Sequence, residues 1–244
     1  GKRQVGKGVL LHALSVIAES DQFPRSTNVR LTHFPRVSQR RGRGSMRTMS
    51  VIQLGPVSLD RMVRAVEKVR QRLLRSAAAL ESAQVPYAVI GGNAVAAWVS
   101  RVDEAAVRNT QDVDILVRRS DLDRVKAALE TAGFVHGSTL DVEFFLDGPD
   151  AGVRDGVHLL MAGEKVKEHY ASPAPGVGQS HRGDDFQVID LEPLVEMKLN
   201  SWRRKDQVHL LDLIGIGLID RRWPERFPEE LGRRLQELLD NPEG

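Results

Sequence analysis

The sequence predicts a mixed α/β domain, with a central mixed sheet flanked by helices and a helical C-terminal section. Two short apolar segments, residues 87–90 and 112–117, are typical of buried strands, and a segment of helical character separates them. Helices and strands do not alternate regularly further along the chain, which argues against a repeating parallel βαβ array. Beyond residue 192 the chain is helical in pattern.

The individual helices and strands are predicted from helix-capping residues, from Pro and Gly residues that end an element, and from the spacing of apolar residues. Ser58 is a good N-cap, and apolar side chains recur at helical spacing over residues 59–84 until Pro86 ends the pattern. Ser120 similarly caps a helix over residues 121–132, and Gly133 ends it. The remaining predicted elements are a helix at 93–100, strands at 134–138, 142–146, 157–161 and 187–191, loops at 147–155 and 171–185, and helices at 192–202, 206–220 and 228–239.

Charge is distributed unevenly along the 244 residues. Residues 1–50 hold ten of the 35 Lys and Arg and two of the 33 Asp and Glu, which gives +8 there and −6 in the rest. Because apolar residues in this segment do not recur with the period of a helix or a strand, we expect residues 1–57 to form a basic, disordered tail. A basic arm that grips phosphates is the other interpretation of residues 39–47. The domain is then expected over 58–244, with its core at 85–191 and C-terminal helices at 192–244.

Several classes of protein are excluded by what the sequence lacks. The chain has no cysteine, so disulfides, thiolate zinc sites and cysteine nucleophiles are ruled out. No apolar run approaches the roughly 18–20 residues that span a bilayer, so we expect a cytoplasmic protein with no membrane partner. The phosphate-binding loop of P-loop enzymes and the nucleophile elbow of α/β-hydrolases are both missing.

The most informative residues are Gly91-Gly92 and the pair Asp112 and Asp114. Glycines between a strand and a helix allow a backbone to approach a phosphate closely, and the helix N-terminus favours the negative charge. Two carboxylates two residues apart in a strand point to the same face and repel each other unless a cation lies between them. Hard oxygen ligands of this kind favour Mg²⁺, which also binds the phosphates of a nucleotide. An edge strand with two exposed acids is the alternative.

In these residues the chain resembles the DNA polymerase β-like nucleotidyltransferase superfamily, and within it the bacterial proteins of abortive-infection and toxin–antitoxin type. The resemblance covers about residues 85–215. The matching residues are Gly91-Gly92-Asn93-Ala94, Arg108, Thr110, Asp112, Asp114 and Ile115, Met197-Lys198-Leu199, and Arg204-Lys205-Asp206.

The resemblance implies a nucleotidyltransferase fold and a metal-assisted transfer of a nucleotidyl group from a nucleoside triphosphate (NTP) to a hydroxyl of a protein, RNA or small molecule. Gly91 and Gly92 would contact the triphosphate, and Asp112 and Asp114 would hold Mg²⁺. Further candidate nucleotide-binding residues are Arg108, Thr110, Lys198 and Lys205, although Arg108 and the two lysines can equally be solvated surface residues.

One position departs from the superfamily pattern. A third carboxylate is expected on a neighbouring strand, but the matching strand, residues 157–161, carries His158. Histidine is a poor Mg²⁺ ligand but can act as a general base near neutral pH. Either His158 is a substitute catalytic base, or the chain is a degenerate binding module that acts as a nucleotide sensor or as the partner of a toxin or antitoxin. A tRNA is a further candidate partner.

Overall fold

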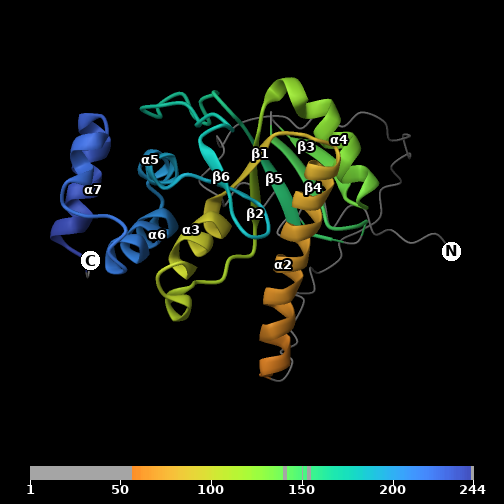
Figure 1. The fold of residues 1–244 in the computed structure, drawn as a ribbon, viewed down its shortest axis with the longest axis horizontal. Coiled ribbons are helices and arrows are strands. Elements are labelled where there is room, and N and C mark those ends of the chain that lie inside the picture. The colour runs from red at the N-terminus through yellow and green to blue at the C-terminus, as the bar shows by residue number, and fades with distance from the viewer. Residues whose placement is uncertain (1–56, 140–141, 150, 153–154, 243–244) are drawn as a thin grey trace, which may run out of the picture.

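The computed structural model describes residues 57–139, 142–149, 151–152 and 155–242 (Figure 1). Apart from its last residue, the predicted basic tail lies outside these ranges. The described chain forms a seven-stranded mixed sheet in the order β3-β4-β5-β2-β1-β7-β6. This architecture confirms the predicted fold class of a mixed sheet flanked by helices, with a helical C-terminal section.

The centre of the sheet brings together strands that lie far apart in the sequence. β1 (Tyr87–Ile90) pairs antiparallel with β2 (Val113–Val117) and parallel with β7 (Gln187–Ile189). β2 pairs parallel with β5 (Gly156–Met161). The outer strands are β3 (Val135–Thr139) and β4 (Val142–Leu146) beyond β5, and β6 (Ser180–Arg182) beyond β7.

Alternation along β2 assigns each side chain to one of two cores. Val113, Ile115 and Val117 are buried against α2 (Leu59–Ser82) and α4 (Leu122–Thr131). Leu116 belongs to the opposite core, with α3, α5, α6 and α7. Those helices span Gly91–Ser100, Leu191–Ser201, Arg204–Gly215 and Glu229–Asp240, and Figure 1 shows them gathered at the end of the molecule away from α4. Because Asp112 and Asp114 share the parity of Leu116, both face the side of α3, α5 and α6.

Several element boundaries differ from the sequence prediction, and one strand was not predicted. α3 begins at Gly91 itself, and β2 begins at Val113, one residue after Asp112. The predicted helix 206–220 ends earlier, because Gly215 closes α6 and Gly217 adopts a positive φ of 79°. β6 lies inside the predicted loop 171–185, since a three-residue edge strand is too short to show alternation. None of the described helices is long and apolar enough to cross a membrane.

The long helix α2 supplies the anchor that holds the loops around the sheet. Arg72 is only 2% exposed, and its guanidinium donates hydrogen bonds to the carbonyl of Gln111 at 3.2 Å, to Asp147 at 3.2 Å and to Asp155 at 3.4 Å. Gln111 immediately precedes Asp112, so this buried cation fixes the approach to β2. Asp155 is therefore tied to α2, on the opposite side of the sheet from Asp112 and Asp114.

Replacing Arg72 with methionine should lower the free energy of unfolding by about 2–3 kcal/mol, because the acids and the carbonyl that it binds lose their donor. Arg70→Met is the matched control: Arg70 is exposed on the same helix, where it forms a surface ion pair with Glu67, and its loss should cost less than about 0.5 kcal/mol. Urea unfolding monitored by circular dichroism measures both. Equal effects of the two substitutions would show that Arg72 is not an anchor.

Candidate active site

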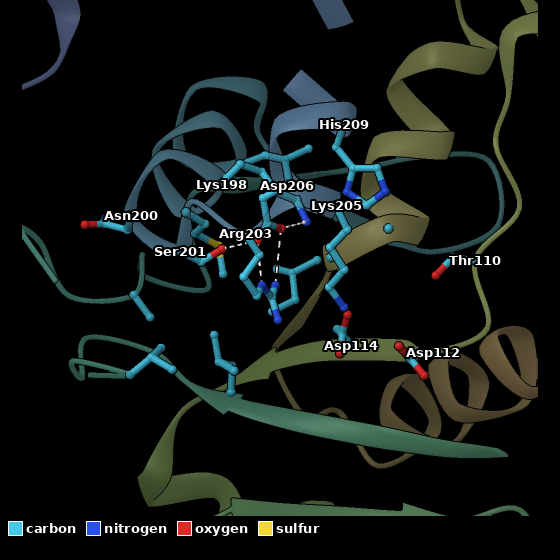
Figure 2. Close-up of a pocket in the computed structure, with 18 of the residues that line it drawn as sticks. Thr110, Asp112, Asp114, Lys198, Asn200, Ser201, Arg203, Lys205, Asp206 and His209 are labelled. Carbon is cyan, nitrogen blue, oxygen red and sulfur yellow. Dashed lines mark hydrogen bonds and ion pairs between the residues drawn. The ribbon is translucent and has the colours of Figure 1, made fainter. Parts of the chain in front are cut away.

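A pocket of about 310 Å³ opens between the adjoining ends of β1 and β2 and the helices α3, α5 and α6 (Figure 2). A volume of this order suits a small-molecule ligand. The pocket brings together seven of the candidate site residues from the sequence, namely Gly91, Gly92, Thr110, Asp112, Asp114, Lys198 and Lys205. These come from four different segments of the chain, so only the tertiary fold makes them neighbours.

The two glycines at the start of α3 are required by the side chains beside them. Gly91 has a φ of +68°, and a Cβ placed on it would lie 2.1 Å from Oδ2 of Asp114. A Cβ on Gly92 would lie 2.7 Å from Oγ1 of Thr110. Both distances are too short for any other residue. The helix therefore begins directly against Asp114, with its N-terminal peptide groups at the pocket.

Asp112 is fixed through the backbone on either side of it. The side-chain amide of Asn93 donates a hydrogen bond to the carbonyl of Asp112 at 2.8 Å. Arg72 holds the carbonyl of the preceding residue, Gln111, at 3.2 Å. The carboxylates of Asp112 and Asp114 both line the pocket, and Figure 2 shows Lys205 extending from α6 towards them. The half-buried pair is thus held rigidly at one end of the pocket.

His158 lies beside Asp114 on the neighbouring strand. The two residues are register partners in the parallel pairing of β2 and β5, and Nδ1 of His158 is 3.7 Å from Oδ1 of Asp114. Its side chain is 26% exposed. The residues that line the pocket include Leu160 from β5 but not His158. The imidazole therefore stands at the margin of the pocket, next to the carboxylate whose other oxygen abuts Gly91.

A buried ionic network lies at the junction of α5 and α6. Asp206 is fully buried and accepts hydrogen bonds from Lys198 at 3.0 Å, from Arg203 at 2.6 Å and from the hydroxyl of Ser201 (Figure 2). Although burial alone would raise it, the pKa of Asp206 lies well below its usual range because of the Lys198 ammonium and the Arg203 guanidinium. Burial also lowers the pKa of Lys198, and Asp206 opposes that shift. The network fixes two cationic side chains at the wall of the pocket.

His209 lies one helical turn beyond Lys205 on α6 and also lines the pocket. Burial, and then the positive charge of Lys198, lower its pKa to about 4, so the imidazole is neutral at pH 7. Its Nδ1 is buried and has no hydrogen-bond partner among the described residues. His209 was not among the site residues predicted from the sequence.

The far end of the pocket is apolar. It is lined by Leu160, Val166, Tyr170, Pro173, Ala174, Leu194 and Met197. Asn200 ties the covering segment to α5, because its Oδ1 accepts from the amide of Ala171 at 2.9 Å and its Nδ2 donates to Ser172 at 2.6 Å. The pocket therefore has a charged end, near Asp112 and Asp114, and an apolar end.

Arg108 is not brought to the pocket. Its guanidinium forms an ion pair with Asp212 of α6 at 2.7 Å, and its side chain is 62% exposed. The predicted contact of Arg108 with phosphates stays a prediction, because its guanidinium is paired with Asp212 and Arg108 is not among the residues that line the pocket. Thr110, two residues later, does line the pocket.

Sequence reasoning missed the role of Asp206 as the centre of a buried network, and named it only among the residues that carry the family resemblance. A signal was present: Asp206, Leu210 and Leu213 follow helical spacing and share the buried face of α6. Lys198 similarly shares a face with Leu194 and Val195 of α5. A charged residue on an apolar helix face needs a buried partner, and the helix break at Trp202 allows these two to meet.

The acidic pair suits a hard divalent cation that takes most of its ligands from elsewhere. Within the described ranges no three His, Cys, Asp or Glu side chains form a group that could hold a metal by themselves. Asp112 and Asp114 therefore fit a cation whose remaining ligands come from a nucleotide's phosphates and water, which is the behaviour of Mg²⁺. The helix start at Gly91 and Gly92 suits the phosphates.

This combination of a mixed sheet, a Gly-Gly helix start and an acidic pair on the next strand is typical of nucleotidyltransferases of the DNA polymerase β-like superfamily. A family model described as "Uncharacterised nucleotidyltransferase" matches residues 58–208, and the chain belongs to that family. The match confirms the resemblance at the level of the superfamily; the abortive-infection type stays a prediction. No curated protein matches the sequence.

Several solved structures are similar to this chain. An antigenic nucleotidyltransferase-like protein from Paracoccidioides brasiliensis is 19% identical, with 72% of this chain and 89% of that chain covered and a TM-score of 0.50. The antibiotic-resistance factor ANT(2'')-Ia is 15% identical, with 74% and 92% covered and a TM-score of 0.42. A putative nucleotidyltransferase from H. pylori is 14% identical, with 77% and 98% covered and a TM-score of 0.35. The similarity to the first of these structures shows the fold alone.

Gly91→Ala should destabilise the protein by about 3 kcal/mol or more, because the new methyl group collides with Asp114 in addition to straining the backbone. Gly133→Ala is the matched control, since Gly133 also has a positive φ, of 87°, but has open space around its Cβ position. That substitution should cost only about 1–2 kcal/mol. Denaturant unfolding compares the two, and an equal loss would contradict a steric role for Asp114.

The depressed pKa of His209 should make stability fall with acidification. Between its folded pKa of about 4 and the ordinary value of 6.5, the unfolded chain binds a proton that the folded chain does not. The contribution of neutral His209 to the free energy of unfolding is therefore fully present above pH 6.5 and is lost as the pH falls towards 4. His209→Gln should reduce the loss between pH 6.5 and about pH 5 by on the order of 1–2 kcal/mol. Urea unfolding at each pH measures this, with the exposed His169→Gln as the control that keeps the wild-type slope.

Proposed function

We propose that the protein transfers a nucleotidyl group from an NTP to a hydroxyl of a protein, RNA or small molecule, with Mg²⁺ as the metal. The observation that carries the proposal is the contact of Gly91 with Asp114, which sets a helix N-terminus against an acidic pair at one end of a pocket. A triphosphate needs both features: peptide groups that bind its oxygens, and carboxylates that hold its cation.

In this proposal each end of the pocket has its own task. The triphosphate lies at the charged end, over Gly91 and Gly92, where Thr110, Lys198 and Lys205 add donors and positive charge. The nucleobase lies at the apolar end, against Leu160, Met197 and their neighbours, because a flat ring gains most from a dry surface. The pocket thereby orients the α-phosphate towards the margin at which His158 stands.

Asp112 and Asp114 would hold Mg²⁺, which when bound neutralises phosphate charge. The reaction forms a bond between the acceptor oxygen and the α-phosphorus and breaks the bond from that phosphorus to the bridging oxygen of the pyrophosphate that leaves. His158 accepts the proton of the acceptor hydroxyl, and Asp114, 3.7 Å away, stabilises the resulting imidazolium. His158 thus replaces the missing third carboxylate.

A second candidate function is a nucleotide-binding module without transfer activity. It is favoured by His158, which stands at the position where the superfamily pattern has a third carboxylate. Such a module would bind an NTP in the same pocket and act through a partner protein. The two candidates share the binding site and differ only in whether a product forms.

Incubation of the protein with Mg²⁺ and each α-³²P-labelled NTP, with cell lysate and tRNA offered as acceptors, tests the proposal. Asp112→Asn combined with Asp114→Asn should reduce label transfer about 100-fold or more, because the cation loses its protein ligands. Asp123→Asn is the control, as Asp123 is an exposed acid on α4, which covers the other face of the sheet.

The outcomes separate the two candidates. Transfer that disappears in the double variant and survives in Asp123→Asn supports the enzyme. If His158→Ala then retains full transfer, another group accepts the proton. Binding of an NTP without transfer to any acceptor supports the binding module instead, and the absence of both contradicts a nucleotide site.

A further inference from the structure

His209 is a polar group in the pocket to which the proposed reaction gives no task. It projects from α6, which packs against α3, the helix that begins at Gly91. Figure 2 shows its ring pointing from α6 into the pocket, between the side of Lys205 and the side of Thr110. His209 therefore faces the charged end of the pocket, where the glycines and Lys205 lie, rather than the apolar end.

The two ring nitrogens of His209 have different surroundings. Nδ1 is buried and lacks a hydrogen-bond partner among the described residues. In a neutral imidazole one nitrogen carries the proton and the other a lone pair. A buried nitrogen without a partner costs free energy in either tautomer, but a proton on Nε2 can meet an acceptor on a ligand in the pocket, whereas a proton on the buried Nδ1 cannot. We therefore place the proton on Nε2. Because the ring lines the pocket while Nδ1 is shielded, the nitrogen available to a ligand is Nε2.

Burial and the charges around the ring keep His209 neutral. Lys198 faces it from α5, and Arg203, Lys205 and Asp206 face it from the start of α6. The adjacent helix α3 contributes no titratable side chain. Three cations against one anion oppose the addition of a second proton. At neutral pH the ring therefore presents a single N–H donor to the pocket, without a positive charge of its own.

We propose that His209 donates a hydrogen bond from Nε2–H to a phosphate oxygen of the bound nucleotide, and so positions the polyphosphate over Gly91 and Gly92. This inference rests on the proposed NTP site. The ligand is a phosphate because this end of the pocket holds a helix N-terminus and the ammonium of Lys205, both of which select for an anion with acceptor oxygens. The carboxylates of Asp112 and Asp114, at the same end, suit the divalent cation that accompanies a polyphosphate. His209 adds a directional contact to that electrostatic selection.

Binding of inorganic tripolyphosphate and of ATP, each with Mg²⁺, measured by isothermal titration calorimetry, tests the proposal. Glutamine places its amide nitrogen near the position of Nε2, and asparagine near that of Nδ1. His209→Asn should weaken both ligands roughly tenfold, the value of one hydrogen bond to a charged acceptor, and His209→Gln should recover most of that loss. His169→Gln, at an exposed surface position, should match the wild type.

The dependence on pH gives a readout that a merely structural role would not produce. The affinity ratio of wild type to His209→Asn should stay constant from about pH 6 to pH 8.5 for a neutral donor, whereas an imidazolium would make the ratio fall as the pH rises. In ¹⁵N-labelled wild type, the histidine spectrum should show Nδ1 unprotonated, and tripolyphosphate should shift the Nε2 resonance. Protonated Nδ1 in that spectrum would overturn the proposal without any variant.

Failure of this inference can be told apart from failure of the proposed function. If ATP binds and is used in transfer but His209→Asn binds tripolyphosphate as tightly as the wild type, His209 is not a phosphate donor and the enzyme proposal stands. If tripolyphosphate binds through His209 but no nucleotidyl transfer occurs, the donor is supported and catalysis is not. If the wild type binds neither ligand, both ideas are wrong.

Discussion

The contact between Gly91 and Asp114 is the constraint on which the pocket depends. No side chain larger than hydrogen fits at residue 91, because a Cβ there would overlap a carboxylate oxygen at 2.1 Å. The antiparallel register of β1 and β2 creates this closeness, since it places Ile90 opposite Asp114. The chain therefore leaves β1 and starts α3 directly above the acidic pair. A helix N-terminus and two carboxylates are brought to one place by sheet pairing alone, before any ligand is present.

The cationic side chains at the pocket wall are positioned by a buried ionic network rather than by sheet pairing. Asp206 is completely buried and draws Lys198 and Arg203 into fixed positions. Such a network is a weak source of stability, because the desolvation of the ions offsets their attraction. Its role here is geometric: the side chains of Lys198 and Arg203 are held in one conformation and form part of the pocket wall. Lys205, in contrast, is exposed and extends over the carboxylates, so it can adapt to what the pocket holds.

The neutral histidine between these two charged sides illustrates how the surroundings set chemistry. His158 and His209 are the same residue type, yet one lies beside a carboxylate at the pocket margin and the other among cations at the junction of α6 and α3. Burial and the nearby cations oppose protonation of His209. In the roles proposed above, His158 accepts a proton, whereas His209 donates a hydrogen bond while remaining uncharged.

The fold class and the acidic pair with its glycines were predictable from the sequence, because alternation, caps and glycine breaks are local properties of the chain. Asp112 and Asp114 share a face simply because strand residues alternate. The placement of Lys198 against Asp206, the diversion of Arg108 to Asp212 and the entry of His209 into the pocket were not predictable in this way. Each depends on how α5 and α6 pack across a helix break and against α3. Sequence spacing determines which residues share an element, whereas only tertiary packing decides which charges meet and which ring nitrogen is left facing the pocket.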